Sequence, residues 1–375
     1  MNFEEHAAKS LVLLPAGIPV PRGQFCTTAR EAAEAVRRIG PAVIKAQVAT
    51  GKRGKAGGIK LANIPDEAER VASAILGMTI GEYTVERLLV EEQAKIAREF
   101  YAAVLSDMKA RKPLILFSTE GGMDIEEVAA AKPDAIRRLL VDFDTSPTAA
   151  DIAPMLQGLG LGPAEDPVAD ILAKLYAAYR QRDAELIEIN PLAQLGDGRI
   201  VALDCKFVLD DAAAYRQDDI SRLAAPAPMT ALERLGAEYG LKFIQLDGNV
   251  GVLANGAGLT MTTMDVIRHF GGRPANFLEI GGEAYTKSAV ALDLVLSNPG
   301  VKSLIINFCG AFARTDVMAD GVVKAWQELK PSLPVFFSIH GTGEKEAVAL
   351  VRERLGIEPY DLMEDAVAAG VRAAQ

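Results

Sequence analysis

The stretch from Leu186 to Asp204 carries three side chains that could hold a metal ion. An apolar segment presents Glu188 and Asn190, a Gly-Asp-Gly turn follows at 196–198, and the returning segment ends in Asp204. Two strands joined by such a turn form a hairpin, and alternation places Glu188 and Asn190 on one face. Converging oxygens suit Mg²⁺, which takes its further ligands from phosphates. A solvent-exposed acidic hairpin is the alternative that this stretch alone leaves open.

A glycine-rich, cationic loop follows an apolar strand predicted at 41–48. Lys45 lies inside that strand, where a lysine is either an edge charge or a phosphate ligand. Glycines in the loop 50–58 allow backbone N–H groups to approach an anion, and its cations neutralise charge. The loop does not match the Walker pattern, because Gly54-Lys55 is followed by alanine and then by a strand at 59–62. We therefore predict a phosphate lid, with a solvated basic hairpin tip as the alternative.

The elements that must position these residues can be read from hydrophobic spacing and caps. The segment 88–92 is predicted as a strand whose backbone can pair with an adenine edge. Helical spacing and N-caps predict the other helices, and continuous apolar runs predict the other strands. The predicted helices cover residues 2–14, 29–39, 133–141, 149–159 and 165–182, and the further strands cover 96–105 and 114–118.

Composition limits the class of protein. The chain has 375 residues, so two domains are the natural expectation. Half of the residues are hydrophobic, which supports a large core, and the net charge of −10 argues against nucleic acid as a partner. Three separated cysteines favour a reducing compartment. The acidic start does not resemble a secretory signal, and no apolar run is long enough to cross a membrane. We expect a cytoplasmic protein, or one of the mitochondrial matrix in a eukaryote.

The pattern changes after an Ala-Pro-Ala-Pro segment at 225–228, which we interpret as the linker between domains 1–228 and 229–375. Strands and helices then alternate, which predicts a doubly wound parallel sheet with ligands at the carboxyl ends of its strands. Glycine-rich loops of this kind beside helix N-termini bind anions, including carboxylates. Three strand ends carry such loops, at 255–258, 281–283 and 310–314.

The ordered set of motifs resembles the β-subunit of succinate–CoA ligase and is similar to the related malate–CoA ligase and ATP-citrate lyase chains. The resemblance extends nearly end to end. It rests on Val-Ile-Lys45, the glycine-rich loop to Gly58, Arg-Glu99-Phe-Tyr, Ile-Glu188-Ile-Asn190-Pro-Leu and Leu-Asp204. It implies an α/β chain in which an ATP-grasp domain precedes a flavodoxin-like CoA-ligase domain.

The resemblance also implies roles for individual residues. Phosphates would be bound by Lys45, Lys52, Arg53 and Gly54, and the base and ribose by Glu91, Ala94 and Glu99. Asn190 and Asp204 would hold Mg²⁺, and Glu188 would steady a histidine of the partner chain. Asn255, Ala311, Phe312 and Ala313 would hold the substrate carboxylate. Pro21 favours ATP over GTP.

The family reaction joins a small carboxylic acid to coenzyme A through an acyl phosphate and a phosphorylated histidine. None of His6, His269 and His340 has the Gly-His-Ala-Gly context of that histidine. The resemblance therefore implies an α-subunit that carries the histidine and most of the CoA site, in an αβ or α2β2 assembly.

Departures from the family pattern gather in the second half. Gly-Gly-Ile-Val-Arg is replaced by Gly310-Ala-Phe-Ala-Arg314, Gly-Gly-Gly-Ala by Gly-Gly-Glu-Ala at 281–284, and Arg-Leu-Glu-Gly-Thr-Asn by the segment 338–343. We expect an acid other than succinate, such as a dicarboxylic, hydroxylated or sulfonated one. Two alternatives remain at this point. One is a carboxylate–amine ligase without CoA, and the other is a nucleotide-binding regulatory subunit with a decayed ligase pocket.

Overall fold

The first unit contains an antiparallel sheet of four short strands. The computed structural model describes residues 1–51, 53–226, 228–281 and 287–375. It divides into two compact units, Met1–Pro228 and Met229–Gln375, each of which is described by itself. The sheet order is β1 (Gly23–Cys26), β6 (Leu88–Glu92), β2 (Ala42–Ala46) and β3 (Ile59–Ala62).

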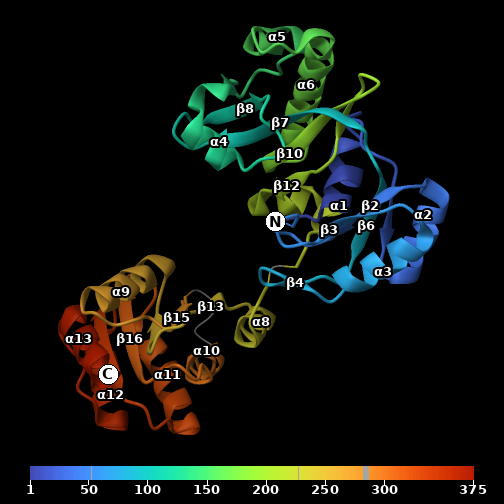
Figure 1. Ribbon diagram of the computed structural model, residues 1–375. Coiled ribbons are helices and arrows are strands. Elements are labelled where there is room, and N and C mark those ends of the chain that lie inside the picture. Colours follow the sequence, from blue (N-terminus) through green and yellow to red (C-terminus); the bar gives the residue numbers. More distant parts are fainter. Residues whose placement is uncertain (52, 227, 282–286) are drawn as a thin grey trace. The chain divides into compact units, whose positions relative to one another are not determined.

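Two helices, α2 (Ala29–Ile39) and α3 (Pro65–Ile75), pack against this sheet and against each other (Figure 1). Thr28 caps α2 in a capping box with Glu31, and Pro65 opens α3 at a position where its missing N–H costs nothing. Small alanines on both helices allow close approach to the sheet. Lys45 lies in β2, between the paired strands β3 and β6, so the position of its backbone is fixed by the sheet.

A larger sheet forms the rest of the first unit. Its order is β11-β10-β7-β8-β9, and β12 also pairs with β10. The apolar side chains of α6 pack against the same core as those of β7, β8 and β10. The bounds are β7 Ile96–Asp107, β8 Lys112–Ser118, β9 Ile136–Leu140, β10 Ala184–Leu195, β11 Ile200–Ala202, β12 Lys206–Leu209, α5 Ala149–Leu156 and α6 Glu165–Gln181.

The hairpin predicted at 186–204 is confirmed. β10 and β11 are antiparallel, and the N–H of Leu195 donates to the carbonyl of Arg199 across the turn. β10 also pairs with β7 on its other edge. Asp204 lies in the short connection between β11 and β12, both of which pair with β10.

The helix predicted at 133–141 is wrong. Residues Pro133–Ala135 form one turn of 3-10 helix, and Ile136–Leu140 is strand β9, paired with β8. Its side chains alternate from the buried Ile136 to more exposed neighbours. The open edge of β8 offers backbone partners to a segment whose alternation suits a strand, and this tertiary pairing outweighs local helix propensity.

The start of the chain is helical, as predicted, but in two parts. Glu5–Ala8 is the α-helix α1, and Lys9–Leu13 continues it as the π-helical turn η1. Phe3 and Ala7 are buried, whereas Leu14 is exposed. The remaining short elements of this unit are β4 Thr79–Ile80, β5 Tyr83–Thr84, α4 Ile125–Ala131, η3 Gly162–Ala164, η4 Asp211–Arg216 and α7 Asp218–Ser221.

The second unit has a parallel sheet covered on both faces. The strands β14 (Val250–Ala254), β16 (Ser303–Gly310) and β17 (Val335–Gly341) pair in parallel, and parallel bridges join β14 to residues flanking β15 (Asn276–Leu278). Val252 and Ile305 face helices α9 and α13, while residues next to them in sequence face α10, α11 and α12. This is the doubly wound arrangement, shown in orange and red in Figure 1.

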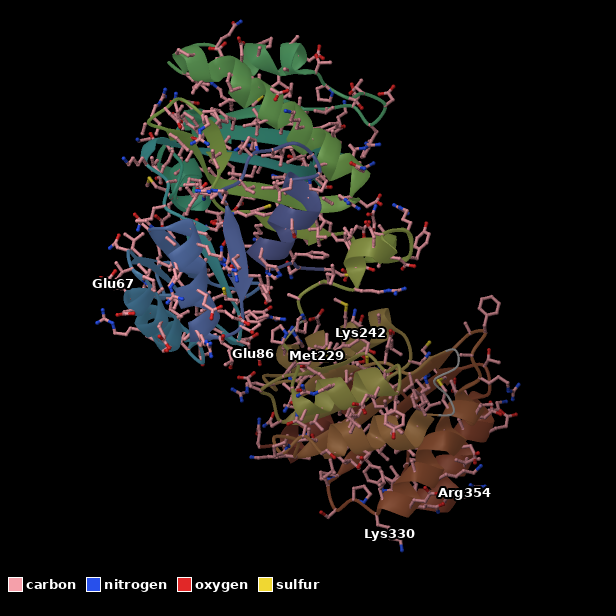
Figure 2. The ribbon with its side chains drawn as sticks, turned by 90° about the vertical axis from the view of Figure 1, so that its right-hand side faces the viewer. Glu67, Glu86, Met229, Lys242, Lys330 and Arg354 are labelled. Carbon is pink, nitrogen blue, oxygen red and sulfur yellow. The ribbon has the colours of Figure 1, made fainter. Side chains whose placement is uncertain are left out.

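One strand departs from the parallel expectation: β13 (Phe243–Gln245) is antiparallel to β15. The helices are α8 Ala231–Glu238, α9 Ala257–His269, α10 Ser288–Leu296, α11 Thr315–Leu329, α12 Glu344–Leu355 and α13 Met363–Ala373. Lys330 and Arg354 lie at the same end of this unit (Figure 2), where α11 and α12 both finish. Among the described residues, no helix is both long and apolar enough to cross a membrane.

Candidate functional site

A buried cluster of charges lies where the N-terminal helix meets strands β2 and β6. The Nζ of Lys45 contacts Glu5 Oε1 at 2.8 Å, Glu91 Oε2 at 2.6 Å and the carbonyl of Leu203 at 2.6 Å. The Nζ of Lys9 contacts both oxygens of Glu91, at 2.7 and 2.8 Å, and Glu5 Oε1 at 2.7 Å. Strand pairing of β2 with β6 brings Lys45 and Glu91 together, and the helix supplies the other two residues.

Arg53 extends this cluster toward the surface. Its guanidinium contacts Glu5 Oε2 at 2.8 Å and Asp204 Oδ1 at 2.7 Å, and it donates to the carbonyl of Ala46 at 3.1 Å. Tight backbone hydrogen bonds within the loop, from Gly57 to Gly54 and from Gly58 to Arg53, turn the loop back on itself. Arg53 is thereby buried, although Gly54, Lys55 and Ala56 after it are exposed.

Burial and mutual attraction act against each other on these groups. Burial opposes the ionisation of Glu5, but Lys45, Lys9 and Arg53 outweigh it and hold the pKa of Glu5 well below its usual value. Burial alone would lower the pKa of Lys45, yet Glu5, Glu91 and Asp204 raise it. Glu5 and Lys45 are therefore charged at neutral pH.

The hairpin residues lie next to this cluster. Asp204 is about a third exposed, so one side of its carboxylate faces solvent while Oδ1 accepts from Arg53. Asn190 is held by the glycine loop after β8: its Oδ1 accepts from the N–H of Gly122 at 2.8 Å, and its Nδ2 donates to the carbonyl of Met123 at 2.8 Å. A side chain at Gly122, whose φ is +70°, would collide with the Glu99 carboxylate.

Glu188 is a half-buried carboxylate on β10. Its Oε2 accepts a hydrogen bond of 3.1 Å from the hydroxyl of Tyr101. Burial raises the pKa of Glu188 against the opposing effects of Lys206 and Tyr101, and repulsion from Asp204 adds to the rise. Glu188 is therefore held in one orientation by Tyr101, close enough to Asp204 to feel its charge.

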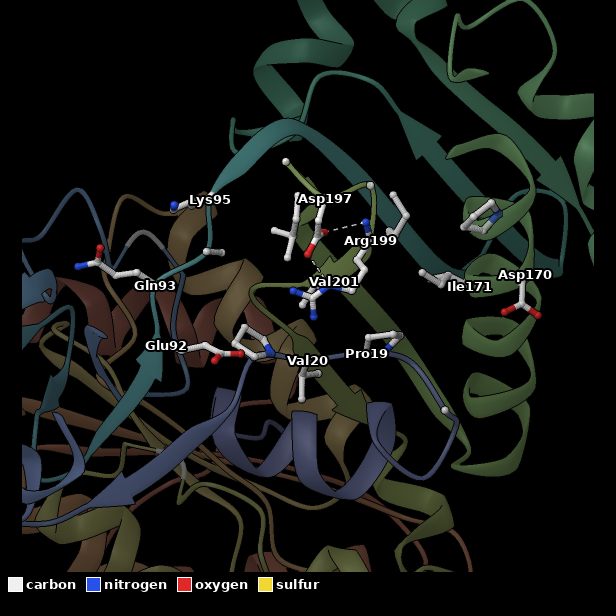
Figure 3. Close-up of a pocket in the computed structure, with 18 of the residues that line it drawn as sticks. Pro19, Val20, Glu92, Gln93, Lys95, Asp170, Ile171, Asp197, Arg199 and Val201 are labelled. Carbon is white, nitrogen blue, oxygen red and sulfur yellow. Dashed lines mark hydrogen bonds and ion pairs between the residues drawn. The ribbon is translucent and has the colours of Figure 1, made fainter. Parts of the chain in front are cut away.

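A cavity of about 580 Å³ opens between the segment 92–95, the hairpin and α6 (Figure 3). Pro19, Val20 and Pro21 form one wall, and Ile200 and Val201 lie on the returning strand. Ala94 lines the cavity, as does Glu92, whereas Glu91 points into the charge cluster. In Figure 3, Asp197 and Arg199 lie together on the hairpin, joined by a hydrogen bond of 2.8 Å. The size of this cavity and its apolar wall residues suit the planar base of a nucleotide.

The donor set fits a nucleotide with Mg²⁺. The five most buried members of the cluster are Glu5, Lys9, Lys45, Arg53 and Glu91, and their three cations against two carboxylates leave one net positive charge. Asp204 and Asn190 add a carboxylate and an amide oxygen, which are ligands that Mg²⁺ accepts. No group of three or more His, Cys, Asp or Glu side chains able to hold a metal occurs in the described part of the chain. Magnesium at this site would therefore need phosphate oxygens as further ligands.

The predicted carboxylate site of the second unit is more open. Asn255 Nδ2 donates to the carbonyl of Cys309 at 2.9 Å, and its Oδ1 accepts from the N–H of Cys309 at 2.7 Å. Phe312 is fully exposed, and the carbonyl of Ala311 accepts from the Thr342 hydroxyl at 2.9 Å. In the part of the chain that is described, the backbone N–H groups of Ala311, Phe312 and Ala313 donate to no protein acceptor. These N–H groups can receive an anion.

The structure thus unites part of the predicted set. Lys45, Arg53, Glu91 and Asp204 are in one cluster, with Glu188 and Asn190 beside it on β10. Gly54 and Ala94 occupy the loop and the cavity wall, while Lys52 and the segment 282–284 lie outside the described residues. The roles of all these residues remain predictions.

Three participating residues were missed by the sequence reasoning. Glu5 and Lys9 have the spacing of an ordinary surface pair four residues apart. They are buried because the apolar side of the helix packs in the core of the larger sheet, while these two side chains contact Lys45 of β2 and Glu91 of β6. Tyr101 resembles any apolar residue of its strand. The only signal in the sequence was that charges stand among the apolar residues of the first helix.

Comparison with protein families identifies both halves. Residues 2–194 match the family described as ATP-grasp domain, and residues 253–367 match the family described as CoA-ligase.

Full-length relatives share this organisation. The ADP-forming succinate–CoA ligase subunit beta of Nitratiruptor sp. is 41% identical over 94% of this chain and 93% of the relative. The GDP-forming succinate–CoA ligase subunit beta of Thermus thermophilus is 43% identical with the same coverage. Among solved structures, the ATP citrate lyase of Methanothrix soehngenii, in complex with citrate and coenzyme A, matches with a TM-score of 0.77 at 24% identity over 99% of both chains. This last likeness concerns the fold.

Proposed function

Since the chain belongs to the family of succinate–CoA ligase β-subunits, we propose that it is the nucleotide-binding subunit of an ADP-forming acid–CoA ligase. The observation that carries this proposal is the cluster of Lys45, Arg53 and Asp204 beside a base-sized cavity. Against the regulatory alternative with a decayed pocket stand Asn190 and Asp204, because a decayed site should lose its metal pair early and both residues are kept.

In the proposed reaction, each half of the chain has a different task. ATP·Mg supplies the phosphoryl group and the cation that neutralises its oxygens. Lys45 and Arg53 bind phosphate oxygens, Asp204 and Asn190 hold the cation, and Glu188, oriented by Tyr101, steadies the histidine of the α-subunit that accepts the phosphoryl group. Catalysis by this half is thus mostly positioning and charge neutralisation.

The acid is proposed to bind at the strand ends of the second unit. The free N–H groups of residues 311–313 suit a carboxylate. Phe312 adds bulk there, and Ala311 restricts backbone approach relative to glycine. We propose a small acid that differs from succinate by size or by a polar substituent, malate being one candidate. The match to the CoA-ligase family over 253–367 disfavours a carboxylate–amine ligase.

The test uses this chain co-expressed with its α-subunit. CoA-dependent ADP formation is followed with succinate, malate and other small hydroxylated and sulfonated acids, and the affinities of ATP and GTP are compared by calorimetry. Turnover of one preferred acid with ATP supports the proposal. A clear preference for succinate would overturn the part that concerns the acid, and absence of any CoA-dependent turnover would favour the regulatory alternative.

A further inference from the structure

The first helix contributes two ionised side chains to the interior of the charge cluster. Side-chain exposure is 4% for Lys9 and 1% for Glu5, values that surface ion pairs do not have. Lys9 makes four contacts of 2.9 Å or less, to Glu5, to both oxygens of Glu91 and to the carbonyl of Leu203. A lysine without a catalytic assignment is thus the most completely bonded cation of the cluster.

The position of Lys9 decides the charge that remains for a phosphate. Lys45 faces two carboxylates, Glu5 and Glu91, and with these partners alone it would be more than neutralised. Lys9 contacts the same two carboxylates and so adds a second positive charge beside them. With Arg53 included, the buried residues then carry one net positive charge, and Asp204, the partly exposed member, offsets it until a cation binds there.

We propose that Lys9 is a positioning residue of the phosphate site, which neutralises Glu91 and so leaves Lys45 and Arg53 able to attract phosphate. Glu5 is the bridge in this arrangement, because its two oxygens join all three cations: Oε1 contacts both lysines and Oε2 contacts Arg53. The inference rests on the proposed function, since it concerns the same nucleotide site.

The discriminating comparison is a double-mutant cycle. Lys9→Met removes one positive charge and leaves Lys45 between two carboxylates, and we expect the affinity for ATP·Mg to fall about tenfold. Glu91→Gln in the same chain removes the matching negative charge. Because Glu91 is itself a predicted nucleotide contact, the double variant is compared with Glu91→Gln alone: Lys9→Met should lower the affinity for ATP·Mg by less than about threefold when position 91 is already glutamine.

Two further measurements separate this role from a merely structural one. The affinity for AMP, which carries fewer phosphate charges, should change much less than the affinity for ATP. Arg30→Met is the matched control, because it removes one positive charge from an exposed pair with Glu34, four residues away. Thermal unfolding of each chain without nucleotide checks that it is folded, and Lys9→Gln, which keeps a hydrogen-bond donor, replaces Lys9→Met if the latter does not fold.

The outcomes are distinct. The inference is supported if Lys9→Met weakens ATP binding in the unmodified chain, loses most of that effect in the Glu91→Gln background, and changes AMP affinity little. If Lys9→Met is folded and binds ATP as the unmodified chain does, the inference is wrong while the proposed function stands. The same holds if Lys9→Met costs as much in the Glu91→Gln background as in the unmodified chain. If the unmodified chain binds no ATP·Mg, the proposed function itself fails.

Discussion

The two candidate sites of this chain are built on opposite principles. In the first unit, charged side chains are buried and bonded to one another, so that Lys45 and Arg53 are fixed before any ligand arrives. In the second unit, the strand ends offer backbone N–H groups and an exposed Phe312. The comparison teaches that buried charged side chains are oriented by partners within the same chain, whereas exposed loops leave backbone N–H groups available.

The largest effect is expected at the centre of the buried site. Lys45→Met should weaken ATP·Mg binding at least about a hundredfold, because a charged phosphate contact is lost. It should also lower the free energy of unfolding by about 3 kcal/mol, since Glu5 and Glu91 lose a buried partner. Calorimetry and urea unfolding measure the two quantities. Lys60→Met, an exposed lysine on the neighbouring strand β3, is the control and should change neither.

Replacing Asp204 should lower activity strongly while changing the free energy of unfolding little. In Asp204→Asn, we expect CoA-dependent ADP formation by the complex with the α-subunit to fall about a hundredfold, because a proposed metal ligand loses its charge. The free energy of unfolding should change by less than about 1 kcal/mol, since the side chain is about a third exposed. A variant that unfolds at much lower urea concentration would show that Asp204 is mainly structural. Asp166→Asn, on the surface of α6, is the matched control.

The cysteines test the difference between the buried first unit and the exposed strand ends of the second unit. Burial raises the pKa of Cys26 to about 11, and it raises that of Cys205 well above its usual value, whereas Cys309 is exposed at the end of β16. Because the thiolate is the reactive form, Cys309 should react with a maleimide at pH 8 at least about tenfold faster than the other two. Labelling of Cys26 should rise only as the pH approaches 11.

Mass spectrometry of labelled peptides assigns each site, with Cys309→Ser as the control. Rapid labelling of Cys205 in the native chain would contradict the buried site, because Cys205 directly follows Asp204.

The smallest effect on the chain itself is expected at Phe312. Phe312→Ala should leave the free energy of unfolding within about 0.5 kcal/mol, since the ring is fully exposed. In complex with the α-subunit, the same variant should change the ratio of kcat/KM between acids by a few fold, because a contact in an apolar pocket is worth about 1–3 kcal/mol at most. An unchanged ratio across the acid panel would remove Phe312 from the specificity site.

Much of this protein can be read from its sequence. The order of Lys45, the glycine-rich loop, the Glu188-Asn190 strand and Asp204 carries the family, and the Gly-Asp-Gly turn gives the hairpin, because tight turns and strand alternation are local properties. The strand β9 was mistaken for a helix because its pairing with β8 is a tertiary contact.

Only the tertiary structure decided which charges belong to the site. Glu5 and Lys9 are separated from Glu91 by more than eighty residues, and nothing local distinguishes them from a solvated pair on a helix. The helix packs in the core of the larger sheet and brings both side chains against Lys45 of β2 and Glu91 of β6, where they are out of water. Their charges must then be paired, since an unpaired buried charge is costly. The sequence determined which charged groups are present, and the fold determined which of them lie in contact in one buried cluster.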